Sequence, residues 1–257
     1  MPRDSIRAKW ARTLSKIRAL KNWYRFVLPE TKFPYRQNAT LRLRNGLWFH
    51  TRNSSFDLPI LLQIFTRNIY DNLHIKGASP AILDIGGHIG MFAAYAARKN
   101  PSARIISFEP DPANHSLFIE NMTTNLLADR VTLIPKAVAA EAGERNLFVN
   151  PLNSSMNNFF HAHPARGMTD SIRVACVTLE DIIRTWGGFD VAKFDCEGAE
   201  YEVLLTASDE TLRALPYLII EWHASDAHTP EDLAERLRNV GYHTTYSKKP
   251  RIITARK

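Results

Sequence analysis

The sequence predicts an α/β fold in which a mainly parallel, twisted sheet carries helices on both faces. From residue 81 onwards, apolar strand-like runs alternate with segments of helical periodicity, and this alternation is typical of parallel sheets. The first run, AILDIGGHIG from Ala81, passes from a strand through an acid and glycines into a helix. Ligands bind beyond the carboxyl ends of the strands in such sheets, so we expect the functional site there.

Five strands and five helices are expected in this alternating part of the chain. The strands are expected at 81–85, 104–109, 131–134, 190–195 and 217–222. The helices are expected at 89–99, 112–126, 178–186, 198–206 and 230–240. Residues 146–177 interrupt the alternation, because two strand-like ends enclose a polar middle that could lie over the mouth of the sheet.

A hairpin and a helix are expected before the first core strand. Two alternating runs within residues 39–52 flank Asn45-Gly46, which is the strongest short signal for a hairpin turn. The run 57–73 then has the pattern of a helix. We therefore expect an extension at 1–38 and one domain at 39–257. In that domain, residues 39–78 lead to a core at 79–257.

The extension is expected to be a basic amphipathic helix over residues 4–27. Residues 1–50 hold 12 Lys and Arg against 2 Asp and Glu, whereas the remainder holds 21 against 24. Such a helix either packs its apolar face on the body or lies on an anionic membrane surface. The acidic balance of the body argues against a nucleic-acid partner. The apolar face consists of Ile6, Trp10, Leu14, Ile17, Leu20, Tyr24 and Val27.

Composition also narrows the cellular setting that we expect. The sequence has no run of 18 uncharged apolar residues, so no transmembrane helix is expected. The basic N-terminus lacks the apolar segment and cleavage site of a secretory signal. Cys176 and Cys196 are too few for a disulfide framework. A reduced, cytoplasmic protein, with any membrane contact peripheral, is therefore expected.

The turn after the first strand favours a cationic ligand. Its pattern is D-x-G-x-x-x-G, and Gly86, Gly87 and Gly90 let the backbone approach a ligand closely. Asp84 would repel the pyrophosphate of a dinucleotide. S-adenosylmethionine instead carries an ammonium and a sulfonium, and a carboxylate beside either contributes on the order of 4 kcal/mol at an effective dielectric near 20.

A second acid follows the next strand. Glu109 lies 25 residues after Asp84 and can accept hydrogen bonds from both hydroxyls of a ribose. Glu109 alone would suit NAD equally well, so the choice of S-adenosylmethionine depends on Asp84 and the glycine spacing. In the structural alternative, Asp84 caps the following helix and Glu109 is a solvated residue at a strand end.

Four segments together resemble the FkbM-type methyltransferases. They are ILDIGGHIGMFAAYAA, IISFEPDPANHSLFIENM, AKFDCEGAEYEVL and LIIEWH, and the resemblance extends over about residues 39–245. The segment KFDCEGAE is the most specific of them. Gly87-His88 stands where the family usually has Ala-Asn, and Cys196 stands where Val is usual.

The resemblance implies a Rossmann-like methyltransferase fold with S-adenosylmethionine as methyl donor. It also implies O-methylation, usually of sugars or hydroxylated natural products. Asp84, Gly86 and Gly90 would contact the methionine end, and Glu109 would hold the ribose. The remaining positions that the resemblance implies are Pro110 and Asp111 around the adenosine, Ala137 and Val138 beside the adenine, and Ser154 and Ser155 in a loop near the pocket.

Two later strand ends supply candidates for activating an acceptor hydroxyl, which needs alignment and removal of a proton. We expect Lys193, Asp195 and Glu197 to meet Glu221 and His223 beside the methyl group, because their strands are neighbours. Lys193 is also a candidate substrate contact.

Three interpretations of this cluster remain open. A general base is the first: His223 has the most suitable ordinary pKa, and Asp195 the more central position. A divalent metal held by Asp195, Glu221 and His223 is the second. In the third, Glu197 and Glu200 only cap and solvate a helix start, where the helix dipole favours acids, and Lys193 pairs with an acid.

We therefore expect an S-adenosylmethionine-dependent methyltransferase that acts on a hydroxyl of a sugar, glycan or hydroxylated natural product. An NAD-dependent oxidoreductase is the rival among enzymes, but the sequence lacks G-x-G-x-x-G. A non-catalytic module that binds S-adenosylmethionine or docks on a membrane is the rival from another class.

Overall fold

A seven-stranded sheet forms the centre of the protein. The computed structural model describes residues 13–26, 38–52, 57–66, 69–70, 78–150, 157–160 and 170–257. The strand order is β11-β12-β10-β9-β3-β4-β5, and these strands all run in one direction except β12, which runs in the opposite direction. The strands are β3 (Ala81–Ile85), β4 (Arg104–Phe108), β5 (Val131–Ile134), β9 (Val191–Phe194), β10 (Tyr217–Glu221), β11 (His243–Lys248) and β12 (Arg251–Arg256).

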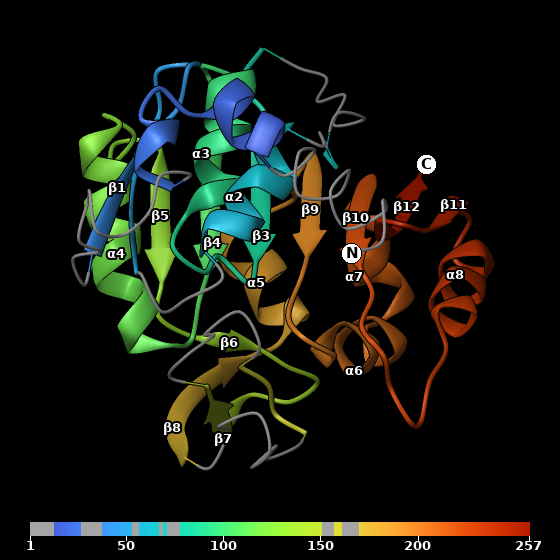
Figure 1. Cartoon of the computed structure of the whole chain (residues 1–257). Helices are drawn as coiled ribbons and strands as arrows, with labels where there is room; N and C mark the ends of the chain where they lie inside the picture. The colour runs from blue at the N-terminus through green and yellow to red at the C-terminus, as the bar shows by residue number, and fades with distance from the viewer. Residues whose placement is uncertain are drawn as a thin grey trace, which may run out of the picture.

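Helices cover both faces of this sheet, as Figure 1 shows. Side chains alternate along each strand. Ile82 therefore belongs to the core under the hairpin, α2, α3 and α4, whereas Leu83 belongs to the core under α5 to α8. The α/β fold class is thereby confirmed. The helices are α2 (Asp57–Thr66), α3 (Met91–Lys99), α4 (Pro112–Thr124), α5 (Leu179–Trp186), α6 (Ala199–Thr206), α7 (Asp209–Arg213) and α8 (Pro230–Asn239).

A smaller sheet lies beyond the carboxyl ends of the central strands (Figure 1). It consists of β6 (Ala137–Val138), β7 (Gly143–Val149) and β8 (Asp170–Val177), in the order β6-β8-β7. β7 and β8 are the two strand-like ends expected around the polar segment. This sheet forms one wall of the region where the site is expected.

The N-terminal part packs over the face of the central sheet that carries α2, α3 and α4. The expected hairpin is present as β1 (Asn38–Arg42) and β2 (Trp48–Arg52). Of the expected helix over 4–27, the described part is helical at 13–19 and continues as the 3-10 helix η1 (Trp23–Phe26). Leu20 is buried against the body, whereas Leu14 and Tyr24 remain exposed.

The expected elements of the core are found within a few residues of their predicted ends. The helix expected over 57–73 ends at Thr66, and most of the residues that follow lie outside the described part. The sequence analysis did not predict α7, β6 or the C-terminal pair β11 and β12. None of the described helices is both long enough and apolar enough to cross a bilayer.

Candidate active site

A cavity of about 270 Å³ opens at the carboxyl edge of the central sheet. Its walls come from the turns that follow β3, β4, β9 and β10, together with α2 and the small sheet. Gly86, Glu109, Asp195 and Glu221 line it, one from each of these four turns or strand ends. The expected position of the site, beyond the ends of these strands, is thus the position of the cavity.

Gly86 forms the floor of the turn after β3 and accepts no side chain. Its φ is +83°, and an added Cβ would lie 1.8 Å from the carbonyl oxygen of Asp195. Gly87 and Gly90 do not line the cavity. A Cβ on Gly87 would meet Ser107, and a Cβ on Gly90 would meet Met122, so these two glycines let the turn pack on its neighbours.

Asp84 differs from the expectation, because its carboxylate does not face the cavity. Asp84 is fully buried. Its Oδ2 accepts a hydrogen bond from the Ser107 hydroxyl (2.7 Å), and its Oδ1 accepts one from Lys193 Nζ (3.1 Å). Lys193 also donates to the carbonyl oxygen of Gly86 at 2.9 Å. Asp84 and Lys193 therefore support the turn from below, and neither is placed to contact a ligand directly.

Glu109 lines the cavity with a carboxylate held on three sides. Backbone N–H groups of His88 and Asp111 donate to it at 2.8 and 3.0 Å, and the Asn114 amide donates at 2.9 Å. Two of these bonds reach Oε1, whereas Oε2 accepts from His88 alone among the described residues. Burial raises the pKa of Glu109, although these hydrogen bonds lower it. Oε2 can therefore accept a hydrogen bond from a ligand hydroxyl.

The other residues expected around a nucleoside divide into two groups. Pro110, Ala137 and Val138 line the cavity. Asp111 instead caps α4 through a hydrogen bond from Ala113 N–H and accepts another from Asn157. Ser154 and Ser155 lie outside the described residues.

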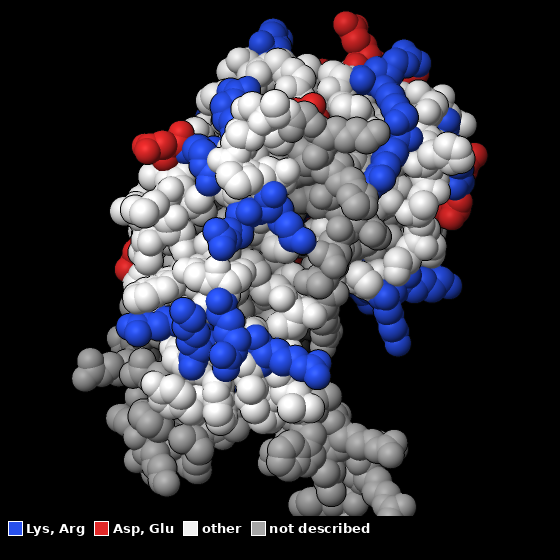
Figure 2. Space-filling view, turned by 90° about the horizontal axis from the view of Figure 1, so that it is seen from above, with Lys and Arg blue, Asp and Glu red and all other residues white. Residues whose placement is uncertain are grey.

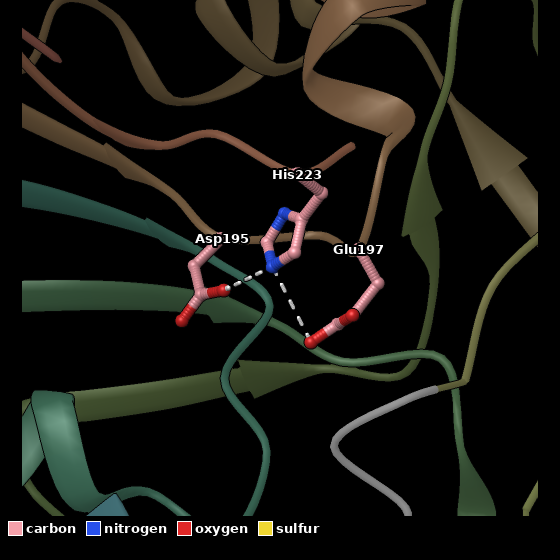
Figure 3. Close-up of side chains that lie close together, drawn as sticks. All are labelled: Asp195, Glu197 and His223. Atoms are coloured by element: carbon pink, nitrogen blue, oxygen red, sulfur yellow. Dashed lines mark ion pairs between the residues drawn. The ribbon is translucent and has the colours of Figure 1, made fainter. Parts of the chain in front are cut away.

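His223 lies between the acids that follow β9, as Figure 3 shows. Its Nε2 is 3.8 Å from Asp195 Oδ1 and 3.5 Å from Glu197 Oε1. On the other side of the ring, Nδ1 is 3.1 Å from Oε1 of the fully buried Glu200. Burial by itself lowers the pKa of His223, but Glu197 and Glu200 together raise it well above the ordinary value. The raised pKa favours the protonated ring, which lies between the carboxylates of Asp195, Glu197 and Glu200.

Glu221 lines the same cavity, and its carboxylate forms no hydrogen bond or ion pair with any described residue. Burial and the nearby Asp195 raise the pKa of Glu221 to about 8, although His223 and Lys193 oppose this. Asp195, Glu197 and His223 also present three ligand atoms within 4.8 Å of one another. The group that could hold a metal thus contains Glu197 in place of the expected Glu221.

The methyltransferase FkbM domain matches residues 84–244 of the chain. The chain belongs to the FkbM methyltransferase family. It is thus a methyltransferase of an S-adenosylmethionine-dependent family, which disfavours the two rivals, an NAD-dependent oxidoreductase and a non-catalytic module.

This FkbM methyltransferase is similar to several known proteins. It is 26% identical over 240 residues to 31-O-demethyl-FK506 methyltransferase FkbM of Streptomyces tacrolimicus, covering 82% of this chain and 91% of that one. It is 28% identical over 195 residues to methyltransferase sdnD of Sordaria araneosa, covering 65% and 75%. The crystal structure of methyltransferase FkbM from Methylobacillus flagellatus is 17% identical with a TM-score of 0.49, covering 73% of this chain and 46% of that chain.

The FkbM methyltransferase has site residues that the sequence analysis did not name. Ile60, Ile64 and Tyr70 form an apolar wall of the cavity, contributed by α2 and the residues after it. Asn157 and Asn158 line the opposite side, where the Asn158 backbone pairs with that of Phe148. The apolar periodicity of α2 predicted a helix but gave no sign that one face borders a ligand.

Proposed function

We propose that this FkbM methyltransferase transfers a methyl group from S-adenosylmethionine to a hydroxyl of an uncharged, polyhydroxylated small molecule, such as a sugar or a hydroxylated natural product. The observation that carries the proposal is the placement of Glu109, Asp195 and Glu221 around one cavity with the Gly86 turn at its floor. Glu109 suits a nucleoside, and the other two suit an acceptor hydroxyl.

The cavity fits S-adenosylmethionine through the groups already described. Oε2 of Glu109 can accept a hydrogen bond from a ribose hydroxyl, and Ala137 and Val138 offer an apolar surface to the adenine. The methionine end would lie over Gly86, where no side chain obstructs it. Carboxylates of the cavity favour the positive charge of the bound donor, because opposite charges attract strongly at low effective dielectric. When bound, S-adenosylmethionine supplies an electrophilic methyl group.

The acceptor side of the cavity indicates a neutral molecule. Apart from Glu109, which we assign to the donor, the described residues that line the cavity include three acids (Asp195, Glu197 and Glu221) and no Lys or Arg. Carboxylates accept hydrogen bonds from hydroxyls but repel an anionic acceptor. The apolar wall formed by Ile60, Ile64 and Tyr70 would bury the carbon face of a ring and exclude water.

Glu221 is the residue that we assign as general base. A base is most effective when its pKa lies near the working pH, and the pKa of Glu221 is raised to about 8. Its carboxylate lines the cavity without a partner among the described residues. Asp195 would orient the acceptor hydroxyl, and His223 would fix Asp195 and Glu197. The proton of the acceptor hydroxyl would pass to Glu221 as the oxygen attacks the methyl carbon, and the bond from that carbon to sulfur would break, with S-adenosylhomocysteine as the leaving group.

A metal-assisted reaction is the second candidate, and one observation favours it. Asp195, Glu197 and His223 could coordinate a divalent cation, with the buried Glu200 orienting the His223 ring from behind. Such a cation would lower the pKa of the acceptor hydroxyl. Chelation of the metal separates this candidate from a reaction that uses Glu221 as general base.

The proposed acceptor chemistry can be measured directly. We expect methylation of neutral polyhydroxylated compounds, detected by mass spectrometry as a gain of one methyl group. For pairs of acceptors that differ only in a carboxylate near the reacting hydroxyl, we expect kcat/KM to be at least about tenfold lower for the acid, because it meets the carboxyl groups of Asp195, Glu197 and Glu221. Equal or faster methylation of the acidic member would contradict the proposed acceptor class.

The assignment of Glu109 to the donor predicts a loss of affinity without a loss of the fold. Glu109→Ala is expected to weaken binding of S-adenosylhomocysteine by about 10- to 100-fold, because hydrogen bonds to a charged group contribute about 1.5–3 kcal/mol. Glu109→Gln keeps the volume and one acceptor oxygen, so a smaller loss is expected. Calorimetry measures both variants, and their thermal unfolding is recorded alongside.

The matched control for this prediction is Glu120→Ala. Glu120 is an exposed acid of α4, and the substitution should leave the affinity unchanged. Tighter binding of NAD than of S-adenosylhomocysteine by the unaltered protein would overturn the assignment of the cavity, as would an unchanged affinity in Glu109→Ala.

A further inference from the structure

A basic surface lies at the end of the molecule opposite the cavity. Figure 2 shows this face from above, with Lys and Arg side chains gathered over it and fewer acids. Within the described ranges 13–26 and 38–48, the sequence contains no Asp or Glu. We call this surface the basic face, and its exposed or half-exposed members are Arg18, Lys21, Arg42, Arg44, Arg98 and Arg130.

Backbone hydrogen bonds and a shared groove bring these basic residues together. Lys21 N–H donates to the Arg42 carbonyl at 2.7 Å, and Arg44 N–H donates to the Ala19 carbonyl at 2.9 Å. Arg98 and Arg130 line a shallow groove together with the hairpin turn. Segments that are distant in the sequence thus form one positively charged surface.

Two exposed apolar side chains lie in the same groove as Arg98 and Arg130 of the basic face. Leu126 is 90% exposed and Trp48 is 38% exposed, and both line the groove. They are neighbours because the side chain of Asn125 forms hydrogen bonds with both the N–H and the C=O of Trp48. The Arg42 guanidinium lies 4.3 Å from the centre of the Trp48 ring.

Leu126 does not serve the fold of the protein. Its side chain is almost entirely in solvent, so it contributes nothing to the core. Its φ of +57° lies in the left-handed region, which favours Gly or Asn over Leu. A large apolar residue in this conformation therefore calls for a role outside the folded chain, and binding to an apolar medium would bury it.

We propose that the basic face docks on an anionic lipid membrane, with Trp48 and Leu126 inserted at the level of the headgroups. Trp is enriched at membrane–water interfaces, and a surface that combines basic residues with exposed Trp and Leu binds anionic lipid by both charge and apolar burial. A nucleic acid would satisfy the charges but would leave Leu126 in water. The proposal is independent of the acceptor and of the proposed function.

Docking in this way would leave the cavity facing the aqueous phase. Arg98 lies in the last turn of α3 and Arg130 precedes β5, so both lie at the amino ends of the parallel strands. The cavity opens at the carboxyl ends of the same strands, roughly 16 Å away for a five-residue strand. The membrane would thus hold the enzyme while a water-soluble acceptor reaches the site.

Sedimentation with vesicles tests this proposal on the full chain without donor or acceptor. We expect binding to vesicles of phosphatidylcholine with phosphatidylserine, no binding to phosphatidylcholine alone, and weaker binding as salt is raised. Arg42→Glu/Arg44→Glu should lower the partition coefficient by at least about 20-fold, since each basic residue contributes about fivefold. Leu126→Asn should lower it by several-fold while raising or preserving the unfolding temperature, because Asn tolerates the left-handed region.

Lys248→Glu/Lys249→Glu is the matched control, with the same change of charge at exposed positions at the other edge of the sheet. It should leave vesicle binding unchanged, and methyl transfer in solution should be unaffected by the Arg42/Arg44 and Leu126 substitutions. Absence of binding to anionic vesicles at low salt would overturn the proposal. A loss in the control pair equal to that in Arg42→Glu/Arg44→Glu would also overturn it, as would tighter binding to duplex DNA that Leu126→Asn does not weaken.

Discussion

Lys193→Met is expected to lower the free energy of unfolding by about 3–5 kcal/mol, the usual effect of removing one partner of a buried ion pair. Lys193 is only 3% exposed, and its Nζ lies 3.1 Å from a carboxylate oxygen of the fully buried Asp84. Methionine has a similar length but no charge, so Asp84 would keep only the Ser107 hydroxyl as a partner. Urea unfolding at pH 7 measures the change.

A second substitution distinguishes the ion pair from simple packing. In Asp84→Asn/Lys193→Met no buried charge is left without a partner, so most of the lost stability should return. Burial already raises the pKa of Asp84, with Lys193 opposing it. The single variant should therefore be least impaired at low pH, where Asp84 is protonated, and more impaired as pH rises. Lys136→Met, at an exposed position, should change the stability by less than about 0.5 kcal/mol.

If the double variant is no more stable than Lys193→Met, the account of the buried pair is wrong. The affinity for S-adenosylhomocysteine gives a separate test of the role of Lys193 in supporting the turn after β3. Lys193 also donates to the Gly86 carbonyl and lies 3.5 Å from Asp195. The double variant should therefore bind S-adenosylhomocysteine less tightly even when its stability is restored.

The positions of Asp84 and Lys193 in the core strands could be predicted from the sequence, but their pairing could not. Periodicity placed both residues in core strands, and the geometry of a parallel sheet placed the strand ends along one edge. The pairing depends on the register of β3 against β9, in which Asp84 lies directly beside Lys193 although 109 residues separate them. The local sequence pattern does not reveal the register between two strands. Asp84 was therefore expected to contact the ligand, whereas it pairs with Lys193.

Glu200 is a second residue whose contact with a distant segment could not be predicted from the sequence. The sequence analysis placed it with the acids that favour a helix start, whereas the structure buries it completely and directs it at His223 N–H and Nδ1.

The pair β11 and β12 was missed for a different reason. β11 is an edge strand with mostly exposed side chains, so its sequence lacks the apolar alternation that predicts a strand.

Glu221→Gln should lower kcat by about 10²- to 10⁴-fold if Glu221 is the general base. The pKa of Glu221 is raised to about 8, so the carboxylate that accepts the proton is scarce at pH 6 and predominant at pH 9. The rate of the unaltered enzyme should rise about tenfold per pH unit below pH 8 and level off above it. The residual rate of Glu221→Gln should lack this rise.

Glu221→Gln should lower kcat but raise the free energy of unfolding. The gain in stability tests the raised pKa of Glu221 without an acceptor. Between an unfolded pKa near 4.5 and the folded value near 8, folded Glu221 holds a proton that the unfolded chain has lost. The stability due to this proton is fully present below about pH 4.5 and is lost as pH rises through 8. Glutamine does not titrate, so Glu221→Gln should gain stability relative to the unaltered protein over this range. The gain should increase with pH through this range and reach about 5 kcal/mol near pH 8, since one pKa unit is about 1.4 kcal/mol.

Chelation completes the comparison between the base and the metal. With Glu221 as base, dialysis against EDTA should leave the rate and its pH profile unchanged, because Glu221 itself removes the proton. With a cation on Asp195, Glu197 and His223, dialysis should abolish the rate, added Mg²⁺, Mn²⁺ or Zn²⁺ should restore it, and Glu221→Gln should retain more than a tenth of kcat. The stability difference of Glu221→Gln depends on proton binding to Glu221 in the unliganded protein. If Glu221→Gln lowers the rate but does not change the stability, the raised pKa of Glu221 is wrong. Glu221 then affects the reaction by positioning the acceptor.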